Sequence, residues 1–319
     1  WFKIAVEQDG IYSINSQFLN SMGINTEDVD PRNIRIFGGH VGMLPEENII
    51  QRVDDLEELA VYFNGDSDSS FEEDEQILFY GQSPHKWELQ EDLNIFHHKQ
   101  NIYSDKTYYF LTINQGLHKS AQNISSSPED VFKFSESQIR EVFDFKERVF
   151  YERDLYNLVS TGQQWFGDYF GGLNQLSIKL QNSSIIFQDS IFFRARVAAR
   201  SSIPSNFEFS LSPVINNFCV IDVPAENSDD YYYEAVEKSL TLDIESGKFF
   251  SNNWDGSLII NYNNNGNPSA LAWLDFVELN FTKDLQYFSQ SNQLNFNAFP
   301  STAHQLDLFH LPLETYLAF

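Results

Sequence analysis

An acidic segment in the first third of the chain contains the residue types that bind calcium. The sequence NGDSDSSFEEDE, residues 64–75, presents carboxylate and hydroxyl oxygens at alternate positions. A Ca²⁺ ion takes about six to eight oxygen ligands from a tightly curled backbone. The candidate ligands are Asp66, Asp68, Ser70 and Asp74. Counted from Asp66, the position of the usual mid-loop glycine holds Phe71 and that of the bidentate glutamate holds Ile77. The segment predicts either a calcium loop or a solvated turn.

The histidines and the single cysteine offer weaker candidates for chemistry. His97 and His98 are adjacent, and neighbouring residues of a strand point to opposite faces, so the pair is unsuited to chelating one metal. Cys219 lies between Phe218 and Val220 in an apolar stretch, which favours a buried, inert thiol. A catalytic thiol would need a histidine nearby in space. We find no catalytic centre and no phosphate-binding glycine loop in the sequence.

An aromatic stretch at residues 151–172, YERDLYNLVSTGQQWFGDYFGG, is the other candidate site. Exposed Trp and Tyr rings stack on sugars, whereas buried ones fasten parts of a core together. The candidate ligand or interface residues are Trp165, Phe166, Tyr169 and, later in the chain, Trp273. Because a series of strands follows this stretch, we expect Trp165 and Phe166 to be largely buried at the start of a sandwich.

Composition excludes several classes of function. The 319 residues contain 20 Lys and Arg against 46 Asp and Glu, and 20 − 46 gives a net charge of −26. A chain without a basic block is unsuited to nucleic acid, and an anionic membrane surface would repel it. The aromatic content of 16% favours strands and provides enough apolar surface for a folded core.

The first 130 residues predict a β-rich domain with one short helix. Residues 2–6 and 11–14 alternate around the turn signal Asp9-Gly10, which predicts a hairpin. A short helix follows, capped by Asn15 or Ser16 and ended by Gly23. The apolar run at residues 77–80 predicts a strand buried on both faces, and residues 106–113 predict a further strand.

The middle of the chain predicts an antiparallel β-sandwich of the jelly-roll type. About seven short strands with alternating apolar residues are separated by turn-forming segments, as is typical of such folds. The Ser- and Asn-rich residues 114–130 predict a linker. We therefore expect an N-terminal domain over 1–130, a sandwich over 131–290 and a tail over 291–319.

Seven motifs in order resemble the N-terminal region of the gingipain-like sortases, cysteine peptidases of the type IX (Por) secretion system of Bacteroidetes. They are DGIYSINSQFLNSMGI, DPRNIRIFGGHVGMLPE, DDLEELAVYFNGD, EEDEQILFYGQSPHKW, NIYSDKTYYFLTI, YERDLYNLVSTGQQWFGDYF and AWLDFVELNFTKDL. The similarity rests on their order between residues 1 and 290; the last 29 residues depart from the pattern.

The resemblance implies an exported protein on the cell surface, at the outer membrane. Such sortases remove the C-terminal sorting signal of secreted cargo and attach the cargo to a lipopolysaccharide anchor. Their peptidase domain follows the region matched here, so no catalytic residue is carried over. The implied partners are that peptidase domain, subunits of the secretion complex and cargo. The alternatives are a glycan-binding sandwich module and, less favoured, a protease in its own right.

Overall fold

The computed structural model describes residues 1–65, 68–113, 116–119, 139–142, 144–158, 160, 162, 164–171, 174–180, 190–212, 215–226, 234–242, 256–284 and 303–306. The described chain is mainly β, with several antiparallel sheets and one short α-helix, as the sequence predicts. Among the described residues, no helix has the length and apolar character needed to cross a membrane.

The described residues divide into two compact units. The first unit comprises those of Trp1–Glu88 and His98–Lys133, and the second comprises those of Leu89–His97 and Phe134–Leu311. A short stretch of the N-terminal half, Leu89–His97, therefore belongs to the second unit. The sequence did not predict this exchange, because the stretch lies in the middle of the predicted N-terminal domain.

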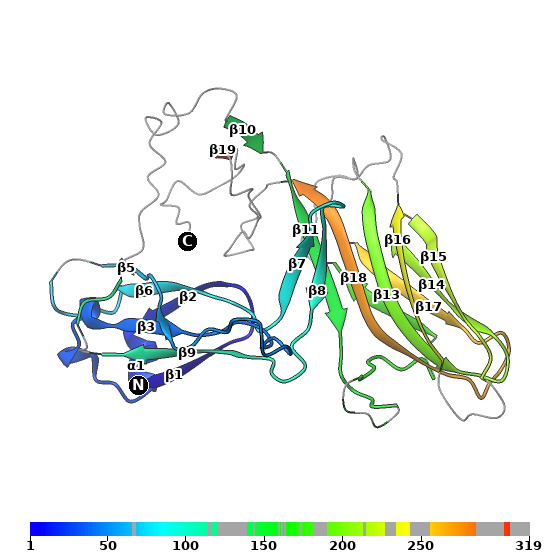
Figure 1. Ribbon diagram of the computed structural model, residues 1–319, viewed down its shortest axis with the longest axis horizontal. Helices are drawn as coiled ribbons and strands as arrows, with labels where there is room; N and C mark the ends of the chain where they lie inside the picture. Colours follow the sequence, from blue (N-terminus) through cyan, green and yellow to red (C-terminus); the bar gives the residue numbers. More distant parts are fainter. Residues whose placement is uncertain are drawn as a thin grey trace. The chain divides into compact units, whose positions relative to one another are not determined.

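Two small sheets enclose the core of the first unit (Figure 1). One sheet has the order β1-β9-β3-β4, and the other has the order β2-β6-β5. Their strands are β1 (Phe2–Val6), β2 (Gly10–Asn15), β3 (Arg35–Gly38), β4 (Glu57–Glu58), β5 (Tyr62–Asn64), β6 (Gln76–Gly81) and β9 (Thr107–Thr112). Buried side chains from both sheets form one cluster, in which the rings of Phe79 on β6 and Tyr109 on β9 meet edge to face at 5.4 Å.

The helix of the first unit begins and ends where the sequence predicts. Helix α1 (Ser16–Ser21) is capped by Asn15, whose side chain accepts a hydrogen bond of 2.8 Å from the backbone N–H of Phe18. Gly23 follows with a φ of +83°, a left-handed conformation that costs glycine little. Leu19 is buried in the core of the unit.

Two local predictions for the first unit are wrong. Strands β1 and β2 form no hairpin: β1 pairs with β9, and β2 pairs with β6. The Asp9-Gly10 turn therefore carries the chain from one sheet to the other. Strand β6 is buried on one face only, since Ile77 and Phe79 are buried whereas Tyr80 is exposed.

The second unit is a jelly roll, which confirms the predicted sandwich. Its strands are β11 (Asp144–Glu152), β12 (Gln175–Lys179), β13 (Ile191–Arg200), β14 (Ser205–Ser212), β15 (Ile215–Val223), β16 (Glu234–Leu242), β17 (Ser257–Asn263) and β18 (Leu271–Asp284). One sheet has the order β11-β18-β13-β16 and the other β12-β17-β14-β15 (Figure 1). Counted from β11, the orders 1-8-3-6 and 2-7-4-5 are those of two interleaved Greek keys.

The apolar alternation read from the sequence builds the jelly-roll core. On β13, Phe193, Ala195 and Val197 face the other sheet, and on β14, Phe207 and Phe209 face back. The rings of Phe193 and Phe209 meet edge to face at 4.9 Å. Cys219 on β15 is 2% exposed in the same core, which confirms the predicted buried thiol, and burial raises the pKa of that thiol.

A further strand pair involves the predicted tail. Strand β10 (Ile139–Val142) pairs in parallel with β19 (Ala303–Leu306). The rest of the segment predicted as a tail, and most of the predicted linker at 114–130, lie outside the described residues.

Truncation of the jelly-roll core should be costly. Because Phe209 is fully buried between the two sheets, Phe209→Ala should lower the free energy of unfolding of the second unit by about 3–5 kcal/mol. Ile203→Ala, at a position 39% exposed, should change it by less than about 0.5 kcal/mol. Urea denaturation followed by fluorescence measures both, and equal effects would contradict the core assignment.

Candidate functional site

The outer face of the β11-β18-β13-β16 sheet carries the densest group of buried polar side chains in the described chain. On β18 the residues that alternate with the core point to this face: Glu278 is 0% exposed, Asn280 3% and Thr282 5%. On the neighbouring β13, Arg194 and Arg196 point the same way. Burying a charged side chain is costly unless the charge is paired. The residues that cover this face therefore determine how its charged groups are paired.

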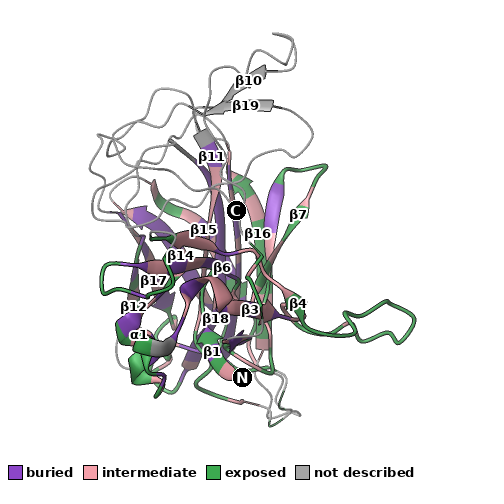
Figure 2. Cartoon of the chain, turned by 90° about the vertical axis from the view of Figure 1, so that its left-hand side faces the viewer, coloured by how far each residue is buried: buried purple, intermediate pink, exposed green. Residues whose placement is uncertain are grey.

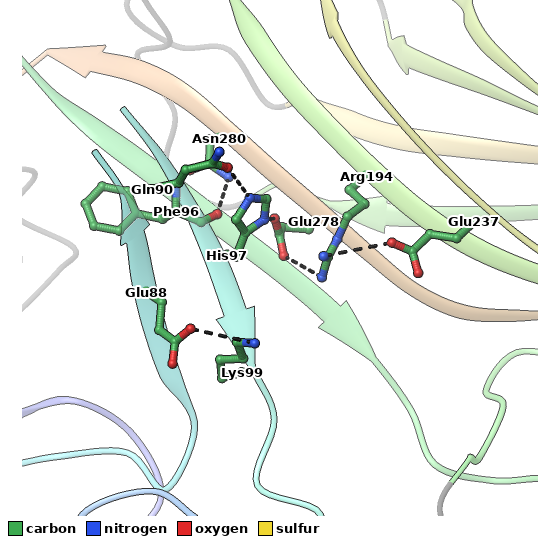
Figure 3. Close-up of polar contacts among 9 residues, drawn as sticks. All are labelled: Glu88, Gln90, Phe96, His97, Lys99, Arg194, Glu237, Glu278 and Asn280. Carbon is green, nitrogen blue, oxygen red and sulfur yellow. Dashed lines mark hydrogen bonds and ion pairs between the residues drawn. The ribbon is translucent and has the colours of Figure 1, made fainter. Parts of the chain in front are cut away.

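A β-hairpin covers one end of the outer face. Strands β7 (Lys86–Gln90) and β8 (Ile95–Lys99) pair with each other, and their tip, Leu89–His97, belongs to the second unit. The side chain of Asn280 accepts a hydrogen bond of 2.7 Å from the backbone N–H of Phe96 and donates one of 2.9 Å to its carbonyl (Figure 3). The side-chain amide of Asn280 thus makes the two backbone hydrogen bonds to Phe96 that a neighbouring strand would otherwise make.

Glu278 contacts the same hairpin through its carboxylate. Its carboxylate lies 3.0 Å from Nδ1 of His97 and 3.2 Å from Nη2 of Arg194 (Figure 3). Nε2 of His97 lies 3.1 Å from the side-chain oxygen of Gln90, and the His97 ring meets Phe192 edge to face. The adjacent His98 packs instead against Trp87. The two histidines therefore serve different contacts, as the sequence predicted for opposite faces of a strand.

The aromatic segment after β11 covers the other end of the outer face. Strand β11 ends opposite Phe276 of β18. Residues 167–170 then pair with the next part of β18, where β11 no longer does. The backbone N–H of Gly167 donates to the carbonyl of Leu274 at 2.7 Å, and the N–H of Leu274 donates to the backbone carbonyl of Asp168 at 3.0 Å. The N–H of Phe170 donates to the carbonyl of Ala272 at 2.8 Å. This backbone ladder fixes the segment to the sheet edge.

Asp168 anchors the aromatic segment to β11 through its side chain. One carboxylate oxygen accepts a hydrogen bond of 2.7 Å from the hydroxyl of Tyr151, and the other accepts one of 2.7 Å from Arg153. Partial burial, together with the Asp168 acceptor, raises the pKa of Tyr151 to about 12. Tyr151 is therefore a protonated hydrogen-bond donor at neutral pH.

The predicted aromatic site residues separate into buried and exposed members. Phe166 and Trp273 are 3% and 5% exposed and pack together against Ala198. Trp165 and Tyr169 are 40% and 43% exposed, so the expectation that Trp165 is buried is wrong. The ring N–H of Trp165 donates a hydrogen bond of 3.3 Å to the carbonyl of Gly162, whereas the backbone of Phe166 pairs with that of Tyr156 in an antiparallel bridge.

Partly exposed aromatic rings lie along this segment. The rings of Tyr156, Tyr169 and Trp273 follow one another at centroid distances of 6.3 and 5.4 Å. Tyr156 is 43% exposed, like Tyr169. We call the three partly exposed residues Tyr156, Trp165 and Tyr169 the aromatic patch; Trp273 is buried. Such a surface suits stacking on the apolar face of a ring-shaped ligand.

Two carboxyl groups on the outer face have strongly shifted pKa values. Burial raises the pKa of Glu152 to about 8, the charges of Asp154 and Asp275 add to the increase, and Arg196 opposes it. Burial raises the pKa of Asp275 to about 6, against the opposing charge of Arg196, whose Nε lies 3.5 Å away. Shifted carboxyl groups mark candidate functional sites, and these two were not predicted from the sequence.

The calcium prediction receives no support from side-chain geometry. Asp66 lies outside the described residues. Asp68 accepts hydrogen bonds of 2.7 Å from the backbone N–H and the hydroxyl of Ser70, an arrangement that closes a turn. Asp74 is exposed. Within the described ranges, no three His, Cys, Asp or Glu side chains gather so as to hold a metal ion. With Asp66 undescribed, the calcium loop stays a prediction.

Loss of the Asn280 side chain should release the hairpin. Asn280→Ala leaves the backbone N–H and carbonyl of Phe96 without these partners in a buried place, which should cost about 2–4 kcal/mol. Amide hydrogen exchange at residues 89–97 should accelerate. Asn261→Ala, which removes an exposed hydrogen bond to Gln175, is the matched control. Unchanged exchange at 89–97 in Asn280→Ala would contradict the clamp.

Replacing Glu152 should stabilise the protein at high pH only. Because the folded state raises the pKa of Glu152 from 4.5 to about 8, the wild type loses stability as pH rises through that window. Glu152→Gln should match the wild type near pH 4 and exceed it by on the order of 2 kcal/mol at pH 9. Urea titrations at both pH values measure the gap, and Glu73→Gln, at an exposed position, controls for the loss of one charge. A gap of equal size at both pH values would contradict burial of the Glu152 carboxyl group.

Comparison with known proteins finds a structural match only. No protein-family model and no curated protein matches the sequence. The fold is similar to that of the crystal structure of dimeric latent PorU from Porphyromonas gingivalis, with a TM-score of 0.64 and 19% sequence identity. The match covers 90% of this chain and 24% of that chain. The chain thus spans about a quarter of that protein's length and shares the fold of the matched part of PorU.

Proposed function

We propose that this chain is the N-terminal, non-catalytic region of a PorU-like sortase of the type IX secretion system, and that it supports the peptidase domain. The observation that carries the proposal is the structural match over 90% of this chain to a quarter of PorU. The ordered sequence motifs from residue 1 to residue 290 favour the same conclusion.

The chemistry of the described residues favours a structural role over a catalytic one. Cys219 is 2% exposed in the jelly-roll core, and burial raises the pKa of its thiol, which opposes the thiolate that a cysteine nucleophile needs. The covered outer face, with its paired charges, has the character of a structural interface. Under the proposal the partners are the peptidase domain, secretion-complex subunits and cargo, at the cell surface.

Two assays test the proposal. The purified chain should not cleave a fluorogenic peptide that carries a cargo sorting signal in the presence of a reducing agent. In the complete protein, removal of residues 1–290 should lower the yield of processed cargo at least tenfold.

Two outcomes would contradict the proposal. One is cleavage by the chain alone that Cys219→Ala abolishes, because it would make the chain a protease. The other is a complete gene without a peptidase domain.

The aromatic patch favours glycan binding as a second candidate function. Its specific support is the exposure of Tyr156, Trp165 and Tyr169, each 40–43% exposed. Partly exposed aromatic rings supply a surface on which a sugar ring can stack.

Variants of the patch separate ligand binding from stability. Trp165→Ala and Tyr169→Ala should abolish signals on a glycan array while lowering the free energy of unfolding by no more than about 1 kcal/mol, because both rings are partly exposed. Phe166→Ala should cost about 3–5 kcal/mol. Tyr103→Ala, at an exposed tyrosine of the first unit, is the control. An array without signals for the wild type would remove this candidate.

A further inference from the structure

The loop between β3 and β4 exposes an unusual amount of apolar surface. Figure 2 shows this segment, residues 39–56, as an exposed excursion beside β4. Its most exposed apolar residue is Ile49, at 89%. The others, between 37% and 54% exposed, are Met43, Leu44, Ile50, Val53 and Leu56. Single exposed apolar residues are ordinary, but six within 14 consecutive positions mark an interaction surface.

Hydrogen bonds within the loop give its tip a defined shape. The Nη2 atom of Arg52 donates to the carbonyl of Pro45 at 3.0 Å and to the side chain of Asn48 at 3.2 Å. The N–H of Ile50 donates to the carbonyl of Glu47 at 3.2 Å, which closes a turn under Ile49. A surface that is already ordered loses less entropy on binding, so the loop is suited to docking as it stands.

A hollow at the base of the loop extends this surface. It has a volume of about 230 Å³, and its walls include Gly39, Gly42 and Leu56 of the loop and Tyr108 and Phe110 of β9. Tyr108 is itself 40% exposed. The hollow is large enough for one side chain of a partner, so loop and hollow form a projection beside a recess.

The negative charge of the loop indicates which kind of partner it can bind. The loop carries Glu46, Glu47, Asp54 and Asp55 against Arg52, and 1 − 4 gives a net charge of −3. The whole chain has a net charge of −26, so a second copy and an anionic lipid surface would both repel the loop. A protein surface with an apolar groove between Lys and Arg side chains offers both the apolar contact and the opposite charge.

We propose that the β3–β4 loop is a docking element that inserts Ile49 and its apolar neighbours into a basic-rimmed apolar groove of a partner protein. Arg52 acts as a positioning residue, since its contacts shape the tip. This inference does not depend on the proposed sortase function, because it rests on the exposure, internal bonding and charge of this loop alone.

Site-specific photo-crosslinking tests the proposal in the cell that makes the complete protein. Benzoylphenylalanine placed at position 49 should give one dominant protein adduct, whereas the same probe at position 117, where Leu117 is 73% exposed, should not. The captured protein is then purified and titrated against the wild-type chain and its variants.

Expected affinities distinguish docking from incidental capture. Ile49→Asp should weaken binding of the purified partner at least tenfold, and Leu117→Asp, with the same charge change, should alter it less than twofold. Arg52→Lys keeps the charge but loses the bonds to Pro45 and Asn48, and should weaken binding several-fold. Affinity should fall as NaCl rises from 50 to 500 mM. Thermal melting checks that each variant is folded.

Several results would overturn the proposal. They are the absence of an adduct at position 49, an adduct to a second copy of the chain, and an adduct to lipid accompanied by binding to anionic phosphatidylglycerol vesicles. Equal affinities of the Ile49→Asp and Leu117→Asp variants for the captured partner would also overturn it.

Discussion

The face-to-face packing of two four-stranded sheets is the constraint on which the second unit depends. A strand places successive side chains on opposite faces, so each strand of the jelly roll gives half its residues to the core. Phe193 and Phe209 meet in that core from opposite sheets. Once this layer is formed, the second face of β18 and β13 is determined as well, and it carries Glu278, Arg194 and Arg196.

The outer face shows how buried polar groups acquire a structural role. Glu278 is fully buried, and its carboxylate contacts both Arg194 and His97. Asn280 satisfies both backbone groups of Phe96, which lies 184 residues earlier in the chain. Such hydrogen bonds specify one arrangement of the chain more strictly than apolar contacts do. When one partner of a buried hydrogen bond is removed, the other partner stays buried without a hydrogen bond. The hairpin tip is thereby assigned to one position on the sheet.

Exposure separates the apolar residues that hold the fold together from those that the fold leaves at the surface. Phe166 of the aromatic segment and Trp273 of β18 are buried, whereas Trp165 and Tyr169 remain partly exposed. In the β3–β4 loop, Ile49 stays exposed although internal bonds order the loop around it. Apolar groups that are ordered but not buried by the fold are available to a partner, and the chain has such groups in both units.

The sequence by itself determined the mainly β class, the strands of the sandwich, the capped helix and the burial of Cys219, because alternation and capping are local patterns. It did not determine which strands pair, as the division of β1 and β2 between two sheets shows. The structure places Glu278, Asn280 and Thr282 on the face of β18 that points away from the core, and these residues were not predicted from the sequence. Only the tertiary structure decided that a distant hairpin covers that face and that Trp165 stays exposed beside buried Phe166, because both depend on contacts between residues far apart in the chain.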